Sequence, residues 1–77
     1  RVNVTEETVR LHSHLVQFRQ LLREEKPVGR RMDFLVQEMN REANTIASKA
    51  GDARIIQTIV DMKSEIEKVR EQIQNIQ

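Results

Sequence analysis

The side chains best suited to chemistry in this 77-residue chain lie between Asp33 and Lys49. An ordinary bundle helix fills its exposed face with Lys, Glu and Ala, whereas this stretch is rich in Asn, Thr and Ser. These are mediocre helix formers, because their side chains compete for backbone hydrogen bonds. Their presence indicates that the side chains have a role beyond packing. The polar positions of the stretch are Asp33, Gln37, Glu38, Asn40, Arg41, Glu42, Asn44, Thr45, Ser48 and Lys49.

Two carboxylates and one imidazole form the candidate reactive centre. Glu38 and Glu42 are four residues apart, so both carboxylates can converge on one point beside a helix. His14 stands at the edge of an apolar stripe in the preceding segment. If the two segments fold back near residue 27 or 28, His14 lies opposite residue 41. We therefore expect His14, Glu38 and Glu42 to meet.

The chemistry of such a centre has two forms. One imidazole with two or three carboxylates suits Mn²⁺ or Mg²⁺ at a phosphoryl site. Glu7, two turns before His14 on the same face, is a further candidate ligand, and we expect it near Ser48 and Lys49. Alternatively, His14 acts as a general acid or base.

A structural interpretation competes with both. Glu38 and Glu42 could pair with Arg41 or Arg31 on a solvated face, because exposed charge pairs are common. His14 on its own is more often a boundary residue with a satisfied ring than a ligand. His12, two residues from His14, lies on a different face of the segment, and we interpret it as a surface residue.

Basic residues near the segment ends could hold phosphates. Arg30 and Arg31 begin the second segment, where free backbone N–H groups favour anions. Lys26 would add a third positive charge to this candidate phosphate-binding site. Lys49 stands near the far end. A solvated basic turn is the alternative.

Two breaks in the sequence define the elements that would position these groups. Pro27 and Gly29 form the first break in the helical pattern. Gly51 and Asp52 form the second, and they suit a helix end followed by the N-cap of a new helix. The predicted helices cover about residues 5–25, 30–50 and 53–75. The fold class is all-α, as an antiparallel three-helix arrangement or a long helical hairpin with coiled-coil-like packing, within one domain over residues 1–77.

The last helix carries an unbroken apolar repeat with alternating spacings of four and three residues, which is typical of a coiled-coil seam. The repeat consists of Ile55, Ile59, Met62, Ile66, Val69, Ile73 and Ile76. A chain this short buries a small core, so a partner is expected. Apolar residues beyond the seams could face it: Val16, Leu21, Val36, Ile56 and Val60.

Composition excludes several classes of protein. Cysteine is absent, which removes disulfides and thiolate sites, and no apolar run approaches the length of a membrane span. The net charge of +1 leaves only local patches for nucleic acid. Phe18 and Phe34 are the sole aromatic residues, so a row of stacking rings is missing. Arg1 at the start suggests a piece of a longer protein.

The sequence resembles a known family over essentially its whole length. The run G-R-R-M-D-F-L-V-Q-E-M-N-R-E-A-N-T-I-A-S-K-A, residues 29–50, resembles the signature of the bacterial YicC/YloC family. T-E-E-T-V-R-L-H-S-H-L-V-Q-F upstream and S-E-I-E-K-V-R-E-Q-I-Q-N-I-Q downstream are similar to the family's neighbouring segments. The likeness is to the C-terminal region of much longer proteins. Ala47 stands where the family usually has Gly, and His12 where it has a basic residue.

The resemblance implies a stress-associated cytoplasmic endoribonuclease that assembles as an oligomer, a hexamer, around an interior that admits RNA. The family motif maps onto His14, Asp33, Gln37, Glu38, Asn40, Arg41, Glu42, Asn44, Ser48 and Lys49. We expect His14, Glu38 and Glu42 to be the reactive or metal-binding centre. Phosphates would then be held by Arg31, Arg41 and Lys49.

Two other functions remain open on this sequence. The domain could be a structural assembly or RNA-channel arm, with catalysis in the missing N-terminal region. A helical adaptor that binds a partner helix is a weaker alternative, since a groove for a helix should be apolar.

Overall fold

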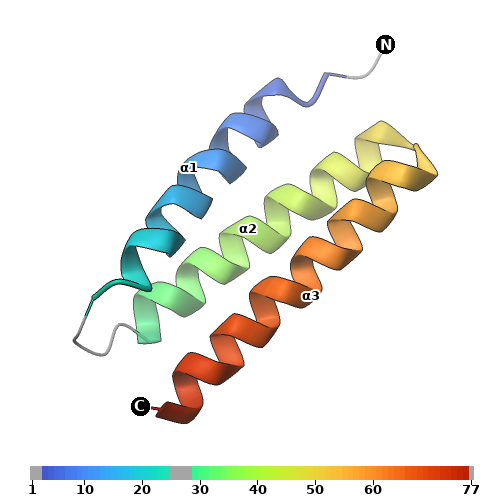
Figure 1. Cartoon of the computed structure of the whole chain (residues 1–77). Coiled ribbons are helices and arrows are strands. Elements are labelled where there is room, and N and C mark those ends of the chain that lie inside the picture. Colours follow the sequence, from blue (N-terminus) through green and yellow to red (C-terminus); the bar gives the residue numbers. More distant parts are fainter. Residues whose placement is uncertain (1–2, 25–28, 77) are drawn as a thin grey trace.

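The computed structural model describes residues 3–24 and 29–76 as three antiparallel α-helices. They are α1 (Thr5–Leu21), α2 (Gly29–Ala50) and α3 (Ala53–Ile76), and Figure 1 shows them running side by side. No strand occurs in the described residues, so the prediction of an all-α, three-helix fold is confirmed. The molecule is elongated, with extents of 44 × 20 × 15 Å.

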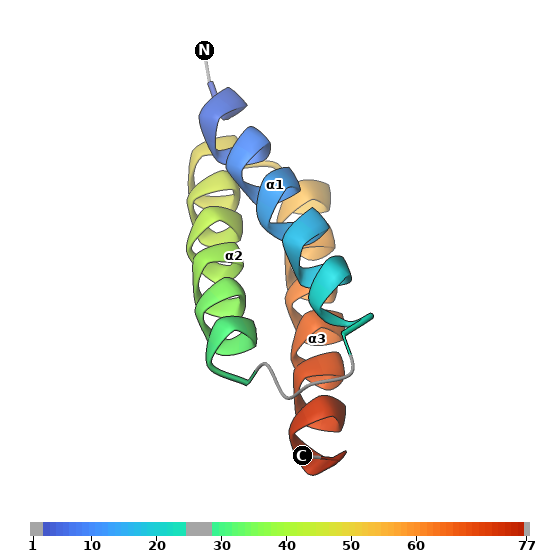
Figure 2. The same cartoon turned by 90° about the vertical axis from the view of Figure 1, so that its left-hand side faces the viewer.

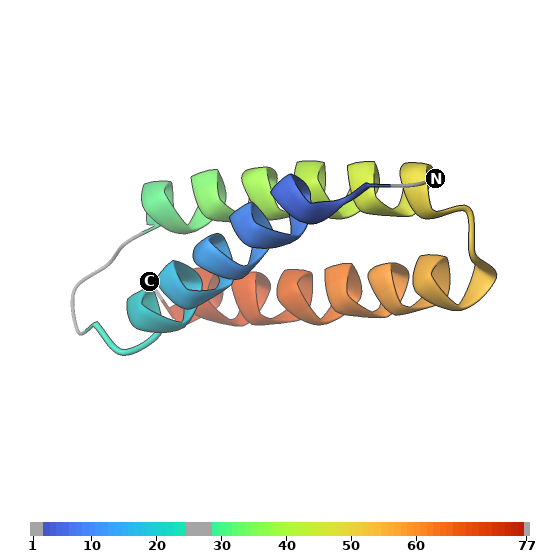
Figure 3. The ribbon, with the colours of Figure 1, turned by 90° about the horizontal axis from the view of Figure 1, so that it is seen from above.

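α2 is the central helix, and both other helices pack on it. Within the described residues, no Cα of α1 comes within 8 Å of a Cα of α3. Figures 2 and 3 show why: α1 crosses obliquely, beginning over α2 and ending toward α3. The start of α3 is therefore left uncovered by α1.

The core is built around the apolar face of α2. Met32, Leu35 and Met39 are the largest of its fully buried side chains. They pack with Phe18 from α1 and Ile66 from α3 in one cluster. Side chains thus join all three helices, although the backbones of α1 and α3 stay apart.

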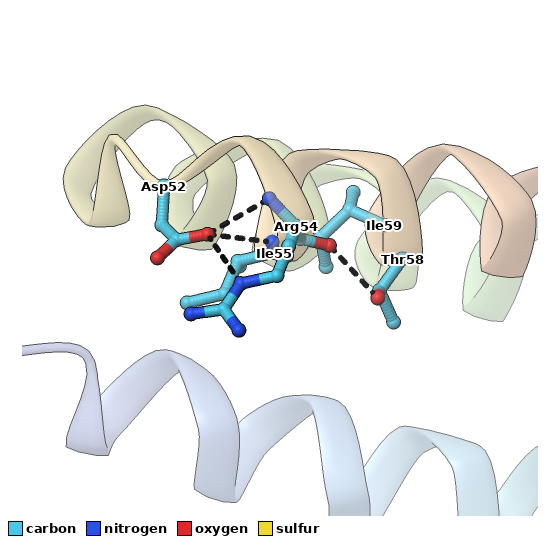
Figure 4. Close-up of a pocket in the computed structure, with 5 residues that line it drawn as sticks. All are labelled: Asp52, Arg54, Ile55, Thr58 and Ile59. Atoms are coloured by element: carbon cyan, nitrogen blue, oxygen red, sulfur yellow. Dashed lines mark hydrogen bonds and ion pairs between the residues drawn. The ribbon is translucent and has the colours of Figure 1, made fainter.

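The turn between α2 and α3 has the chemistry that the sequence predicts. Gly51 has a φ of +64°, in the left-handed region that glycine adopts without steric cost. Asp52 Oδ1 accepts hydrogen bonds from the backbone N–H groups of Arg54 at 2.8 Å and Ile55 at 3.4 Å. Figure 4 shows this N-cap at one end of a hollow of about 390 Å³, on the side of α3 that faces α1.

The first helix is shorter than predicted. It ends at Leu21 instead of extending to about residue 25. The N–H groups of Arg23 and Glu24 donate to the carbonyls three residues back, Gln20 and Leu21, so the chain tightens into a turn. Glu25, Lys26 and Pro27 lie outside the described residues. The other two helices agree with the predicted ranges to within one residue.

The apolar repeat of α3 faces the interior over most of its length. Ile59 and Ile66 are buried, and Met62, Val69 and Ile73 pack against the core from partly buried positions. Ile55, at the uncovered start, is exposed, and the side chain of Ile76 is outside the described part. No helix of the described residues is long and apolar enough to cross a membrane.

Candidate active site between α1 and α2

A buried carboxylate and a histidine meet across the α1–α2 interface. His14 Nδ1 lies 2.9 Å from Glu42 Oε1, where the two side chains are 18% and 4% exposed. The estimate that His14 faces residue 41 was therefore correct to within one position. Glu42 is fixed by the packed face of α2, two helical turns from Leu35 and beside Ala43. The result is an imidazole held by a carboxylate that is nearly removed from water.

Arg10 and Glu7 continue the same line of charges along α1. Arg10 Nε lies 4.0 Å from Glu42 Oε2, and Arg10 Nη2 lies 3.6 Å from Glu7 Oε2. Lys49 Nζ donates a hydrogen bond of 3.0 Å to Glu7 Oε2. Glu7 does meet Lys49 as the sequence predicts. We call these five residues, Glu7, Arg10, His14, Glu42 and Lys49, the α1–α2 polar line.

The line compensates each buried carboxylate with positive charge. The hydrogen bond from Lys49 lowers the pKa of Glu7 below its ordinary value of 4.5, and the charges of Lys49 and Arg10 act in the same direction. Burial opposes this effect. Glu7 is therefore ionised at neutral pH despite its small exposure. An uncompensated buried charge would instead be strongly destabilising.

The third member of the predicted centre lies apart. Glu38 pairs with Arg41 at 3.4 Å, one turn along the same helix. No group of three or more His, Cys, Asp or Glu in residues 3–24 and 29–76 is arranged to hold a metal ion. The Mn²⁺ or Mg²⁺ site with ligands His14, Glu38, Glu42 and Glu7 stays a prediction, and these described residues do not assemble it.

The outward face of α2 carries most of the remaining signature. Arg41 is 76% exposed at its side chain, and Gln37, Asn44 and Ser48 are exposed as well. Phe34 is 57% exposed on this face, whereas Phe18 is buried. Arg31 is exposed in the first turn of α2. Of the three expected phosphate-binding residues, Arg31 and Arg41 are accessible, while Lys49 is engaged by Glu7.

A second set of polar contacts joins α2 to α3. Arg70 Nη1 donates to Asp33 Oδ1 at 3.0 Å, and Arg70 Nη2 donates to Glu67 Oε2 at 2.6 Å. Lys63 Nζ donates to Asn44 Oδ1 at 2.7 Å. Asp33 and Asn44 thus have structural partners that the sequence analysis did not assign. Asn40 Oδ1 is buried and forms no hydrogen bond with any described residue.

Sequence reasoning missed Arg10, Lys63 and Arg70. Arg10 could have been found, because it lies three residues after Glu7 and four before His14 on one helix face. Arg70 is 37 residues from Asp33, and only the packing of α3 on α2 brings them together.

Comparison with known proteins identifies the family. The model of the family "Endoribonuclease YicC-like, C-terminal" matches residues 1–77. This chain belongs to that family. The resemblance inferred from residues 29–50 and their flanks is confirmed.

Two curated relatives share the domain. A probable endoribonuclease YicC of Clostridioides difficile (strain 630) is 52% identical over 75 residues, covering 97% of this chain and 26% of the relative. A probable endoribonuclease YicC of Haemophilus influenzae (strain ATCC 51907 / DSM 11121 / KW20 / Rd) is 46% identical over 77 residues, covering 100% of this chain and 27% of the relative. The chain thus spans about a quarter of these relatives' length. No solved structure matches this YicC-like domain.

Proposed function

We propose that the intact protein cleaves RNA phosphodiester bonds and that the His14–Glu42 pair of this YicC-like domain moves the proton in that reaction. The observation that carries the proposal is the 2.9 Å contact between His14 Nδ1 and the buried Glu42 carboxylate. Both relatives are described as probable endoribonucleases, which supports RNA as the substrate.

Glu42 would set the chemistry of the imidazole. An ionised carboxylate is only an acceptor, so it favours the tautomer with the proton on Nδ1. Nε2 then has a free lone pair. In the proposed step, Nε2 takes the proton from an RNA 2′-hydroxyl, and the 2′-oxygen attacks the adjacent phosphorus. The bond to the 5′-oxygen breaks, that oxygen takes a proton from water, and the His14 imidazolium gives its proton to the hydroxide so formed, leaving a 2′,3′-cyclic phosphate and a 5′-hydroxyl.

Nearby cations would stabilise the charge that develops on the phosphate oxygens. Arg10 lies within 4.0 Å of the carboxylate that holds His14, and its side chain is half exposed. Preformed positive charge at the position where negative charge develops is commonly a large contribution to catalysis. Arg31 and Arg41 on the outward face of α2 would hold flanking phosphates.

The test compares RNA cleavage by the intact protein with that of His14→Ala and Glu42→Gln. General acid–base catalysis is worth roughly 10²–10⁴-fold, so we expect a loss of that order in kcat for His14→Ala. Glu42→Gln retains an acceptor for Nδ1 but removes the charge, and we expect a smaller loss. Glu65→Gln, an exposed carboxylate paired with Lys68 on α3, is the matched control and should cut normally.

Folding must be excluded as the cause of any loss. Circular dichroism melting of each variant separates an unfolded protein from an inactive one. A His14→Ala protein that is folded and cuts at the normal rate removes the proposal. Glu38→Gln tests the remaining predicted member, and its partnership with Arg41 leads us to expect little change in kcat.

In the metal-dependent version of the proposal, His14 and Glu42 would be two ligands for Mn²⁺ or Mg²⁺. Any further ligand would come from parts of the intact protein other than residues 3–24 and 29–76. Titration of Mn²⁺ while following the His14 ring signals by NMR tests it. Ring signals that stay unchanged in a folded protein exclude this version.

A second candidate function is assembly of the intact protein into an oligomer. Ile56 and Val60 are 41% and 53% exposed and lie one turn apart on α3. Apolar side chains at this spacing are the anchors with which one helix packs on another. We propose the same face of a second copy as the partner, because a two-fold contact places one patch on both sides.

A further inference from the structure

An open-sided hollow of about 270 Å³ lies between α2 and α3, on the flank of α2 that faces away from Glu42. We call it the α2–α3 pocket. Its volume is far larger than the roughly 10–15 Å³ that a cavity needs on the same measure to hold one water molecule, so a single bridging water would not fill it. The pocket is lined by Asp33, Val36, Gln37, Asn40, Glu67 and Arg70.

Asn40 lines the pocket and carries a buried acceptor atom that has no donor. Its Oδ1 atom is inaccessible to solvent and has no hydrogen-bond partner among residues 3–24 and 29–76. Buried polar atoms in native proteins are nearly always paired, so an unpaired one calls for an explanation. Gln37, three residues earlier and on the same helix face, adds an exposed amide beside it. The exposed Gln37 amide offers a base one donor and one acceptor group, and a rotation of the Asn40 side chain would turn its unpaired Oδ1 toward the same space.

Arg70 gives the pocket a fixed planar group. Its Nη1 donates to Asp33 at 3.0 Å, and its Nε donates to Glu67 Oε1 at 3.2 Å and Oε2 at 3.1 Å. These bonds lie along the edge of the guanidinium and hold its plane, while its face is not used by them. A guanidinium plane is one of the surfaces on which unpaired RNA bases stack. Val36 supplies an apolar wall.

The charge of the pocket selects the kind of ligand. Asp33 and Glu67 carry two negative charges and Arg70 carries one positive charge, so the lining is net negative and disfavours a phosphate. Carboxylate and amide oxygens instead accept hydrogen bonds from exocyclic amino groups. Asn and Gln commonly pair with adenine, and Asp and Glu accept from the amino group of cytosine. Uracil presents carbonyl oxygens at the equivalent positions.

We propose that the α2–α3 pocket binds one unpaired RNA base and prefers the amino-bearing bases adenine and cytosine to uracil. The inference rests on the proposed function, because it takes RNA as the ligand. It adds a base-recognition subsite on one flank of α2 to the proton-transfer pair on the other.

The experiment measures binding of fluorescently labelled RNA decamers, oligo(A), oligo(C) and oligo(U), to the intact protein by anisotropy at one fixed salt concentration. The phosphate charge is the same in all three, so differences report on the bases. A good base contact discriminates by about 5- to 150-fold, and we expect oligo(A) or oligo(C) to bind at least about 5-fold more tightly than oligo(U).

Asn40→Ala should reduce this preference to about 2-fold or less while leaving the affinity for oligo(U) unchanged. Asn44→Ala is the matched control, because it removes the same side chain one turn further along α2, where Asn44 bonds to Lys63 outside the pocket. If Asn40→Ala does not fold, Gln37→Ala replaces it, since Gln37 is exposed and its removal should also weaken the preference.

Three results would overturn the subsite: equal affinity for all three RNAs, an unchanged preference in folded Asn40→Ala and Gln37→Ala, or no binding of RNA. The proposed cleavage function is judged separately by the His14→Ala rate. A protein that cuts RNA through His14 but shows no base preference loses the subsite alone. A protein with an Asn40-dependent preference whose cleavage ignores His14 loses the proton-transfer proposal alone.

Discussion

The two buried carboxylates differ in what compensates them. Glu7 is matched by Lys49 and Arg10, which are permanently charged at neutral pH, whereas Glu42 is matched chiefly by His14, whose charge depends on a proton. A lysine or arginine partner is sufficient for a structural ion pair. An imidazole partner adds a ring nitrogen that can accept or donate a proton. This difference makes Glu42 the better candidate for chemistry and Glu7 the better candidate for stability.

The stability role of Glu7 gives a pH prediction. Its pKa in the folded protein is below the ordinary value of 4.5, so the unfolded chain binds this proton more readily. The contribution of Glu7 to stability is therefore present above the unfolded pKa and is lost as the pH falls through the folded pKa. We expect Glu7→Gln to flatten the decrease in melting temperature between about pH 5 and pH 3.

Glu65→Gln is the matched control for this measurement. Glu65 is exposed beside Lys68, so its removal should leave the pH dependence of the melting temperature close to that of the unaltered protein. Some acid sensitivity will remain in Glu7→Gln, because the hydrogen bond from Arg70 lowers the pKa of Glu67 as well. An identical pH slope in Glu7→Gln and the unaltered protein would show that the Lys49 contact does not stabilise the fold.

At the scale of the elements, local signals determined most of what the sequence could predict. Gly51 and Asp52 defined the α2–α3 turn because the left-handed conformation and the N-cap depend on a few adjacent residues. The end of α1 was misplaced, since the chain leaves the helix four residues before the predicted end near Glu25. His14 and Glu42 could be paired by counting along a helical hairpin.

The contacts that sequence reasoning could not give depend on packing between distant segments. Arg70 reaches Asp33 across 37 residues, and no spacing rule predicts that pairing. Glu38 and Glu42 have a spacing that allows convergence, yet packing buried one with His14 and left the other with Arg41. Helical spacing therefore identified Glu38 and Glu42 as candidates but could not determine which residues each of them contacts.

The N-cap of α3 provides a prediction for an element. Removing the side chain of Asp52 leaves the N–H groups of Arg54 and Ile55 without their acceptor. Loss of an N-cap costs about 1 kcal/mol, with a range of roughly 0.5–2 kcal/mol. In a domain of this size, 1 kcal/mol corresponds to about 4–8 °C in melting temperature. We expect Asp52→Ala to lower the melting temperature by that amount.

Asp61→Ala is the control for the cap. Asp61 lies in the interior of α3 and accepts a hydrogen bond from the exposed Gln57, so the same substitution there removes no cap. Its melting temperature should change by less than about half as much, because exposed substitutions usually alter stability by less than about 0.5 kcal/mol. Equal losses in the two variants would contradict a capping role for Asp52.

At the scale of the whole molecule, the central position of α2 separates the polar groups onto different surfaces. Its α1 flank holds the His14–Glu42 pair, for which proton transfer is proposed, its α3 flank holds the α2–α3 pocket, and the face between them carries exposed Phe34 and Arg41. A single RNA strand lying along this outward face would have access to both flanks. The apolar pair Ile56 and Val60 is on α3, so assembly through it need not cover that face.

The assembly proposal is tested by replacing Ile56 and Val60 with lysine. In the intact protein we expect Ile56→Lys with Val60→Lys to reduce the sedimentation coefficient to that of a smaller species, since two ammonium groups cannot be buried in an apolar contact without a large desolvation cost. Leu22→Lys is the matched control, because Leu22 is 39% exposed at the opposite end of the bundle, beyond the last turn of α1. The control should sediment as the unaltered protein does. An unaltered protein that is monomeric at every concentration, or an oligomer that the double substitution leaves intact, would show that this face of α3 does not hold the subunits together.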